Sequence, residues 1–129
     1  MLVSKVRGKI TLKQKTRSSA YIINATKDCK LIAPSMLPYE IGNALTRLKR
    51  RQILSGKQII TAYNDFKRIP LRLLEVDIEN ALRIACNFSI YAYDAYYLEM
   101  AYRLNLPLLT LDRSMKKTAL ELKLKVLEE

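Results

Sequence analysis

The chain contains no histidine and only two cysteines, so acid–base or metal chemistry would have to rest on its carboxylates. Three of its twelve acidic residues stand where an expected strand ends or an expected helix begins: Glu40, Asp94 and Asp112. If these carboxylates converge, a hard divalent cation with oxygen ligands, Mg²⁺ or Mn²⁺, relieves their repulsion most readily. Such a cation generates a nucleophilic hydroxide and holds a phosphate oxygen, which is the chemistry of phosphodiester hydrolysis.

Each of these carboxylates also fits an ordinary structural role. Asp94 fits a helix N-cap, Glu40 a first-turn acid that interacts well with the helix dipole, and Asp112 an Asx turn after a strand. For each carboxylate taken alone, the structural role is a better explanation than a functional site. Their joint placement at element ends favours a shared site.

Several site classes are excluded by what the chain lacks. Without histidine it forms no Ser-His-Asp triad, no Cys-His pair and no zinc site that needs imidazole. Its three glycines, Gly8, Gly42 and Gly56, cannot spell a phosphate-binding loop or a dinucleotide-binding turn. Cys29 and Cys86 are too few for a zinc ribbon and are typical of reduced, buried thiols, which predicts a cytoplasmic protein. No apolar run reaches the 18 residues of a membrane span, so we expect a soluble protein.

Length and charge predict one basic domain. At 129 residues the chain fits a single domain over 1–129. Its net charge is +11, and residues 1–30 contribute +7 from eight basic residues and one acid. This imbalance favours a polyanionic partner such as nucleic acid, although a solvated tail or a transit peptide also explains the basic segment over 1–17.

The elements that would position the acids alternate along the chain. A strand over 31–33 ends at Pro34, and the next helix contains Pro38 in its first turn and an apolar stripe. Ser55 caps a further helix that ends before Pro70. The inner positions expected in these two helices are Ile41, Leu45 and Leu48, and then Ile59, Tyr63 and Phe66.

The second half of the chain continues the alternation. Strands are expected over 71–76, 106–111 and 124–127, and helices after Asp77, over 92–104 and over 113–122. Residues 2–6 predict a first strand and 18–25 a short helix. Strands separated by such helices pair in parallel, so we expect a three-layer α/β/α sandwich with a central, mainly parallel sheet. The inner helix positions are Ile78, Leu82 and Ala85, and then Ala95, Leu98, Ala101 and Tyr102.

Three segments of the sequence resemble the successive motifs of PIN-domain proteins. They are Leu31–Ser35 followed by Tyr39–Leu45, then Tyr93–Tyr97, then Leu109–Asp112. The most similar type is the VapC-like toxin of prokaryotic toxin–antitoxin pairs. The resemblance extends from about Ser18 to the C-terminus and keeps the motif order and spacing.

The resemblance implies a parallel sheet between helices, whose clustered acids bind Mg²⁺ or Mn²⁺ and cleave RNA. It assigns Glu40, Asp94 and Asp112 to that cluster, with Asn43 one helical turn after Glu40. It also implies a homodimer and a VapB-like antitoxin whose basic tail enters the acidic site. The supporting groups that it suggests are Thr110, Arg113 and Ser114.

One departure from the family concerns its first acidic ligand, at the end of the N-terminal strand. No Asp or Glu precedes Asp28, and Ser4 or Lys5 falls near the expected position. Losing a carboxylate lowers metal affinity, and an inward Lys5 ammonium would replace the cation. Two alternatives follow: a degenerate PIN domain that binds antitoxin or RNA without cleavage, and a basic nucleic-acid-binding adaptor.

The tyrosines around Asp94 allow two interpretations. They are Tyr91, Tyr93, Tyr96, Tyr97 and Tyr102. Their rings could stack on RNA bases, but at helical spacing most are expected in the core or at an interface.

Overall fold

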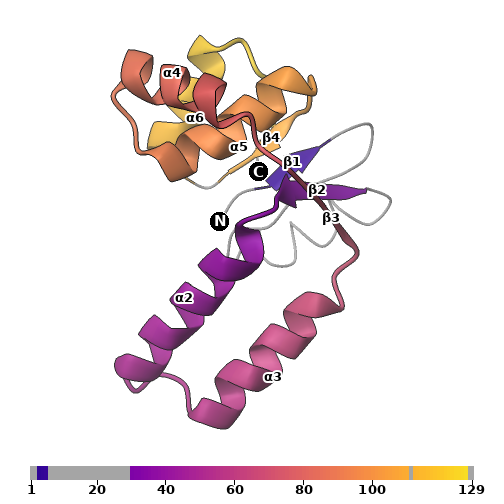
Figure 1. Ribbon diagram of the computed structural model, residues 1–129, viewed down its shortest axis with the longest axis vertical. Coiled ribbons are helices and arrows are strands. Elements are labelled where there is room, and N and C mark those ends of the chain that lie inside the picture. The colour runs from indigo at the N-terminus through magenta and orange to yellow at the C-terminus, as the bar shows by residue number, and fades with distance from the viewer. Residues whose placement is uncertain (1–2, 6–29, 111, 128–129) are drawn as a thin grey trace. The chain divides into compact units, whose positions relative to one another are not determined.

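A computed structural model describes residues 3–5, 30–110 and 112–127. The chain divides into two compact units. The sheet unit takes in the described residues of 1–35 and 71–129, and the helical unit is residues 36–70 (Figure 1). The single domain over 1–129 stays a prediction, and the helix expected over 18–25 lies outside the described residues. No helix in the described ranges is both long and apolar enough to cross a membrane.

The sheet contains five short strands in the order β3-β2-β1-β4-β5. β2 pairs in parallel with β3, and β4 pairs in parallel with β5. The central strand β1 is antiparallel to both of its neighbours. The strand bounds are β1 Val3–Lys5, β2 Leu31–Pro34, β3 Leu71–Leu74, β4 Leu108–Leu109 and β5 Val126–Leu127.

The mixed α/β class is therefore confirmed, but the mainly parallel sheet is corrected to a sheet of mixed direction. Buried parallel strands are almost continuously apolar, whereas antiparallel strands tolerate polar residues. The sequence Val3-Ser4-Lys5 suits the second class. The polar residues Ser4 and Lys5 therefore fit the antiparallel pairing of β1.

The core of the sheet unit lies around β2 and α5. All four residues of β2 are buried. Pro34 is the last residue of the strand, which agrees with the predicted end of the strand at this proline. Ile32 packs with Met100 and Leu106 in one buried cluster. β3 is an edge strand, so Arg72 and Leu73 are exposed.

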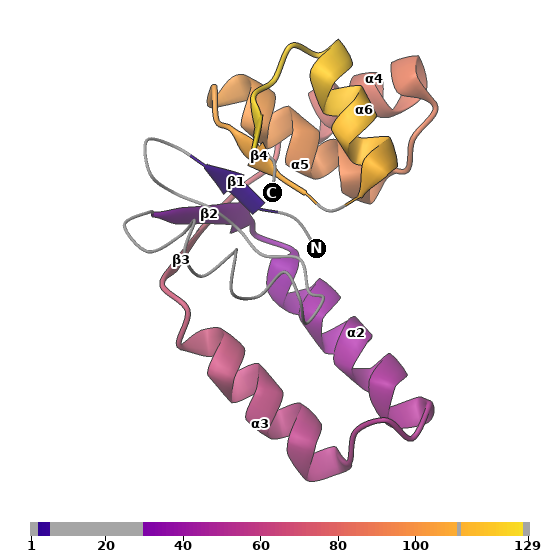
Figure 2. The same ribbon diagram turned by 180° about the vertical axis from the view of Figure 1, so that it is seen from behind.

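Three helices of the sheet unit lie in the described residues, and both views show them close together (Figures 1 and 2). α4 packs along α5, α5 contacts β1 and β2, and α6 contacts β5. Asp77 caps α4 as expected, because its Oδ1 accepts the Asn80 N–H at 3.0 Å. The helices are α4 Ile78–Phe88, α5 Ala92–Arg103 and α6 Arg113–Glu121.

Two of the expected inner faces need correction. On α4 the buried residue is Ala81, whereas Ile78 and Leu82 are 56% and 46% exposed. The helix is apolar on two sides, so its periodicity alone did not select the packed one. On α5 Ala95, Leu98 and Ala101 are buried as expected, but Tyr102 is exposed.

The helical unit is a pair of packed helices, α2 Leu37–Arg50 and α3 Gly56–Lys67 (Figure 2). Ser55 begins α3 with a capping box, in which its side chain and that of Gln58 exchange bonds with backbone N–H groups. The expected inner positions of α3 are half-buried, and none of its residues is fully buried. Two of these inner side chains, Tyr63 and Phe66, contact each other, because their ring centroids are 5.9 Å apart.

Four helices end on a residue with left-handed backbone, and none of these residues is glycine. In each case the next residue is apolar, and its N–H bonds to the carbonyl five residues earlier at 2.8–3.1 Å. This pattern satisfies helix carbonyls that lack an intrahelical partner. The left-handed residues are Gln52 after α2, Ser89 after α4, Asn105 after α5 and Lys123 after α6.

Candidate functional site

Asp112 is held in place at the start of α6, just beyond the carboxyl end of β4. Its Oδ1 accepts the Met115 N–H at 2.9 Å, so it is the N-cap of the helix. Its own N–H donates to Thr110 Oγ1 at 3.0 Å, and Thr110 is buried. Asp112 is half-buried and fixed by two local hydrogen bonds. The position at a strand's carboxyl end agrees with the sequence prediction.

Asp94 lies in the first turn of α5 and is half-buried. The N-cap of α5 is Tyr91, whose side chain makes no capping hydrogen bond. Asp94 is therefore not the N-cap of α5, and that interpretation of the sequence is wrong. A carboxylate in the first turn still interacts favourably with the helix dipole.

The tyrosines around Asp94 are mostly exposed. Tyr91 and Tyr93 are 85% and 61% exposed, whereas Tyr97 is buried. The Tyr93 ring meets Tyr96 edge-on, with centroids 5.8 Å apart. Of the core or interface positions expected for these tyrosines, the core is therefore shown for Tyr97, and an interface or base-stacking role of the others stays a prediction.

Glu40 lies in the first turn of α2 and is half-buried. It belongs to the helical unit, whereas Asp94 and Asp112 belong to the sheet unit. Asn43 is exposed one turn further along α2, and Arg113 and Ser114 are exposed in the first turn of α6. The convergence of the three acids stays a prediction.

The carboxylates fit a hard divalent cation by their donor chemistry, since Mg²⁺ and Mn²⁺ prefer oxygen ligands. Within the described ranges, however, no three or more acidic or cysteine side chains form a group that could hold a metal ion. The three carboxylates are thus the right kind of ligand for such a cation, and their assembly into one metal centre stays a prediction.

The register of β1 decides where its residues stand relative to Asp112. Val3 pairs with Leu109, at the carboxyl end of β4, and Lys5 pairs with Leu31, at the amino end of β2. Lys5 is therefore at the sheet edge opposite to the one that β4 leaves toward Asp112. Whether its ammonium takes the place of the cation stays a prediction.

One buried acid was not anticipated from the sequence. Glu99 on α5 is 2% exposed, and its Oε1 lies 2.6 Å from Nε of Arg103. Glu99 Oε2 accepts the Asp77 N–H at 3.2 Å, and Arg103 donates to the Glu75 carbonyl oxygen at 3.0 Å. The hydrogen bond with Glu99 raises the pKa of Arg103 above its ordinary value. The i,i+4 spacing signals the pair, but only the fold shows that it anchors the connection from β3 to α4.

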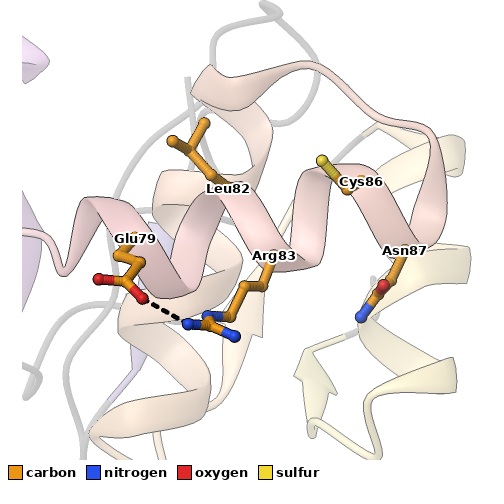
Figure 3. A pocket seen from close by; sticks show the side chains of 5 residues that line it. All are labelled: Glu79, Leu82, Arg83, Cys86 and Asn87. Carbon is orange, nitrogen blue, oxygen red and sulfur yellow. Dashed lines mark hydrogen bonds and ion pairs between the residues drawn. The ribbon is translucent and has the colours of Figure 1, made fainter.

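A shallow depression lies on the surface of α4, and all of its labelled side chains come from that helix (Figure 3). Glu79 and Arg83 form an ion pair across it, and Cys86 is exposed beside them. None of the candidate site residues lines it. This hollow is one face of a helix and adds no chemistry to the site.

A comparison of the chain with protein-family models and with curated proteins finds no match in either.

Proposed function

We propose that the chain is a metal-dependent endoribonuclease of the PIN type, similar to the VapC-like toxins. The observation that carries the proposal is the position of Asp112 directly beyond the carboxyl end of β4, next to the central strand β1. The strand order runs outward in both directions from β1, and α/β sheets bind ligands outside strand carboxyl ends at such a point. A net charge of +11 suits RNA as a polyanionic substrate.

Glu40, Asp94 and Asp112 would hold Mg²⁺ or Mn²⁺, which would supply an activated water and stabilise charge on the scissile phosphate. Thr110 supports this role because its hydroxyl accepts the Asp112 N–H and fixes the start of α6. The capping bond to Met115 restrains the carboxylate itself.

Three further side chains would contact the RNA. The exposed Arg113 and Ser114 stand in the first turn of α6, where a guanidinium and a hydroxyl can donate to phosphate oxygens. Asn43 stands one turn after Glu40 and would donate its amide N–H to a neighbouring phosphate or sugar oxygen.

The test is cleavage of single-stranded RNA by the purified protein in Mn²⁺ and in EDTA. We expect cutting in Mn²⁺ only, and a loss of at least about 100-fold in the Asp94→Asn and Asp112→Asn variants, since even outer-shell changes at metal sites cost 10–100-fold. Asp65→Asn is the matched control, because it removes one exposed carboxylate from α3. Cleavage that survives EDTA, or that falls equally in Asp65→Asn, would contradict the proposal.

A second candidate function is binding of RNA or of an antitoxin without cleavage. It is favoured by the absence of any acid before Asp28 and by the register of β1, which carries no carboxylate to the edge near Asp112. A site with one acid fewer binds a divalent cation less strongly. A parent protein that binds RNA but cuts none in Mn²⁺ would select this candidate.

The same resemblance supports the remaining proposals, which are a homodimer, a VapB-like antitoxin and a cytoplasmic location. Light scattering on the purified chain measures its molar mass and so tests for the homodimer. Co-purification with the product of a neighbouring small gene tests for a complex with the antitoxin.

A further inference from the structure

One face of α2 connects Glu40 to a group of arginines. Glu40, Asn43 and Arg47 follow one another at helical spacing, and Arg50 and Arg51 continue the same face at the end of the helix. We call Arg47, Arg50 and Arg51 the arginine stripe. All three are exposed, and the face is distinct from the one that buries Leu37 and Ile41.

The arginine stripe is not needed to complete the end of α2. The last carbonyls of the helix accept bonds from backbone N–H groups: Arg51 to Arg47, Gln52 to Lys49 and Ile53 to Leu48, at 3.0 Å each. No ion pair between described residues involves an arginine of the stripe. Within the part of the chain that the structure describes, these guanidinium groups therefore have no ion-pair partner.

The charges of the stripe interact with one another as well as with the end of the helix. Basic residues in the last turn interact favourably with the helix dipole. Like charges at i,i+3 and i,i+4, such as Arg47 with Arg50 and Arg51, destabilise a helix. The helical unit as a whole has seven basic and two acidic residues, a net charge of +5. An external anion would offset this repulsion.

We infer that the arginine stripe binds the phosphodiester backbone of single-stranded RNA and carries it along α2 from Glu40. The choice of RNA rests on the proposed function. Guanidinium groups bind phosphate through paired hydrogen bonds. Glu40 and Arg51 are eleven residues apart, or roughly 16 Å along a helix, which corresponds to about five nucleotides of a stacked strand.

The composition of the face favours a polyanion over a protein partner. Protein interfaces have an apolar core surrounded by polar residues. Between Glu40 and Arg51 the face contains no large apolar side chain, and Arg47 and Arg51 repeat at one-turn spacing. Regularly spaced cations on a rigid element match regularly spaced phosphates.

The test measures binding of a labelled, unstructured 12-nucleotide RNA by fluorescence anisotropy in EDTA over a range of salt concentrations. The test variant is Arg47→Gln/Arg50→Gln/Arg51→Gln. Each lost phosphate contact lowers the slope of log K against log salt by about 0.7, so three lower it by about 2, or about 100-fold in affinity at 0.1 M salt. A three-nucleotide RNA is too short to span the face and should show a much smaller difference.

The matched control removes the same charge from the sheet unit, in Arg72→Gln/Lys117→Gln/Lys125→Gln, all exposed positions. We expect less than about a threefold loss there, since general charge acts weakly at this salt. The Arg47→Lys/Arg50→Lys/Arg51→Lys variant should keep most of the salt slope. Circular dichroism and the melting temperature check the fold of every variant.

The inference is overturned if the two Gln variants lose affinity equally, if the Lys variant loses as much as the Gln variant, or if a polyglutamate peptide of equal charge competes as well as RNA. The last result would indicate an acidic protein. Failure of the proposed function looks different. A protein that binds RNA through the stripe but cuts none in Mn²⁺ refutes the nuclease and leaves the inference intact.

Discussion

Ala33, Leu98 and Leu108 of the sheet unit are fully buried, whereas in the helical unit only Leu37 and Ile41 are less than one-tenth exposed. Residues 36–70 have a net charge of +5 and residues 71–129 a net charge of −1, but residues 1–35 contribute +7, so the sheet unit as a whole has a net charge of +6. Buried apolar surface therefore contributes more to the stability of the sheet unit than to that of the helical unit. Asp94 and Asp112 thus belong to the unit with the larger buried core, whereas Glu40 and the arginine stripe belong to a unit with few buried side chains.

The largest expected effect tests the core of the sheet unit. Leu98→Ala should lower the free energy of unfolding by about 2–5 kcal/mol, because it removes a fully buried side chain and leaves a cavity. Ile60→Ala on α3 is the control, since Ile60 is 61% exposed, and it should cost less than about 1 kcal/mol. Urea unfolding measures both. Equal losses would remove the distinction between the two units.

An intermediate effect is expected at the buried ion pair. Arg103→Met leaves the Glu99 carboxylate without its cation and should cost about 1–3 kcal/mol, less than a fully buried pair because the Arg103 side chain is 39% exposed. Arg83→Met, which breaks the exposed pair with Glu79, should cost less than about 0.5 kcal/mol. Urea unfolding at one pH compares them.

The pH dependence of that effect follows from the raised pKa of Arg103. A base whose pKa is raised on folding contributes stability that is fully present below its unfolded pKa, which for arginine lies far above neutral pH, and that stability is lost only as the pH rises through the folded pKa. The cost of Arg103→Met should therefore be constant between pH 6 and pH 9. A cost that changes steeply in this window would show that another group controls the interaction.

The smallest effect tests the local stabilisation of the helical unit. Ser55→Ala removes one half of the capping box and should cost about 1 kcal/mol. Thr46→Ala removes an exposed hydroxyl that donates to the Asn43 carbonyl within α2, and should cost less than about 0.5 kcal/mol. Thermal unfolding of the two variants checks this. A negligible loss in Ser55→Ala would mean that packing, rather than capping, maintains α3.

Local chemistry made most element positions predictable. Asp77 and Ser55 begin helices by hydrogen bonds that their side chains form within three residues, so no distant contact is needed to anticipate them. The packed side of α4 was not predictable, because Ile78 and Leu82 are as apolar as the residues that face inward. Only the neighbouring helix decides between two apolar sides.

The candidate site was predictable in the same uneven way. The position of Asp112 after a strand follows from its neighbours in sequence. The direction of β1, and with it the location of Lys5, depends on pairing with strands more than 25 residues away. Burial of Glu99 depends likewise on α4 and β3, which reach it from distant parts of the sequence. Long-range pairing is the part that residue types and spacing do not specify.

The left-handed residues that end four helices have a consequence for engineering this protein. Left-handed backbone is unfavourable for residues with a Cβ atom and costs glycine nothing, so Gln52, Ser89, Asn105 and Lys123 are positions where glycine relieves strain. Natural proteins are seldom at their stability optimum. These four positions lie outside the candidate acids and the arginine stripe. Glycine at these positions should raise the stability of the protein, so that even destabilising substitutions at the proposed site could be studied in folded protein.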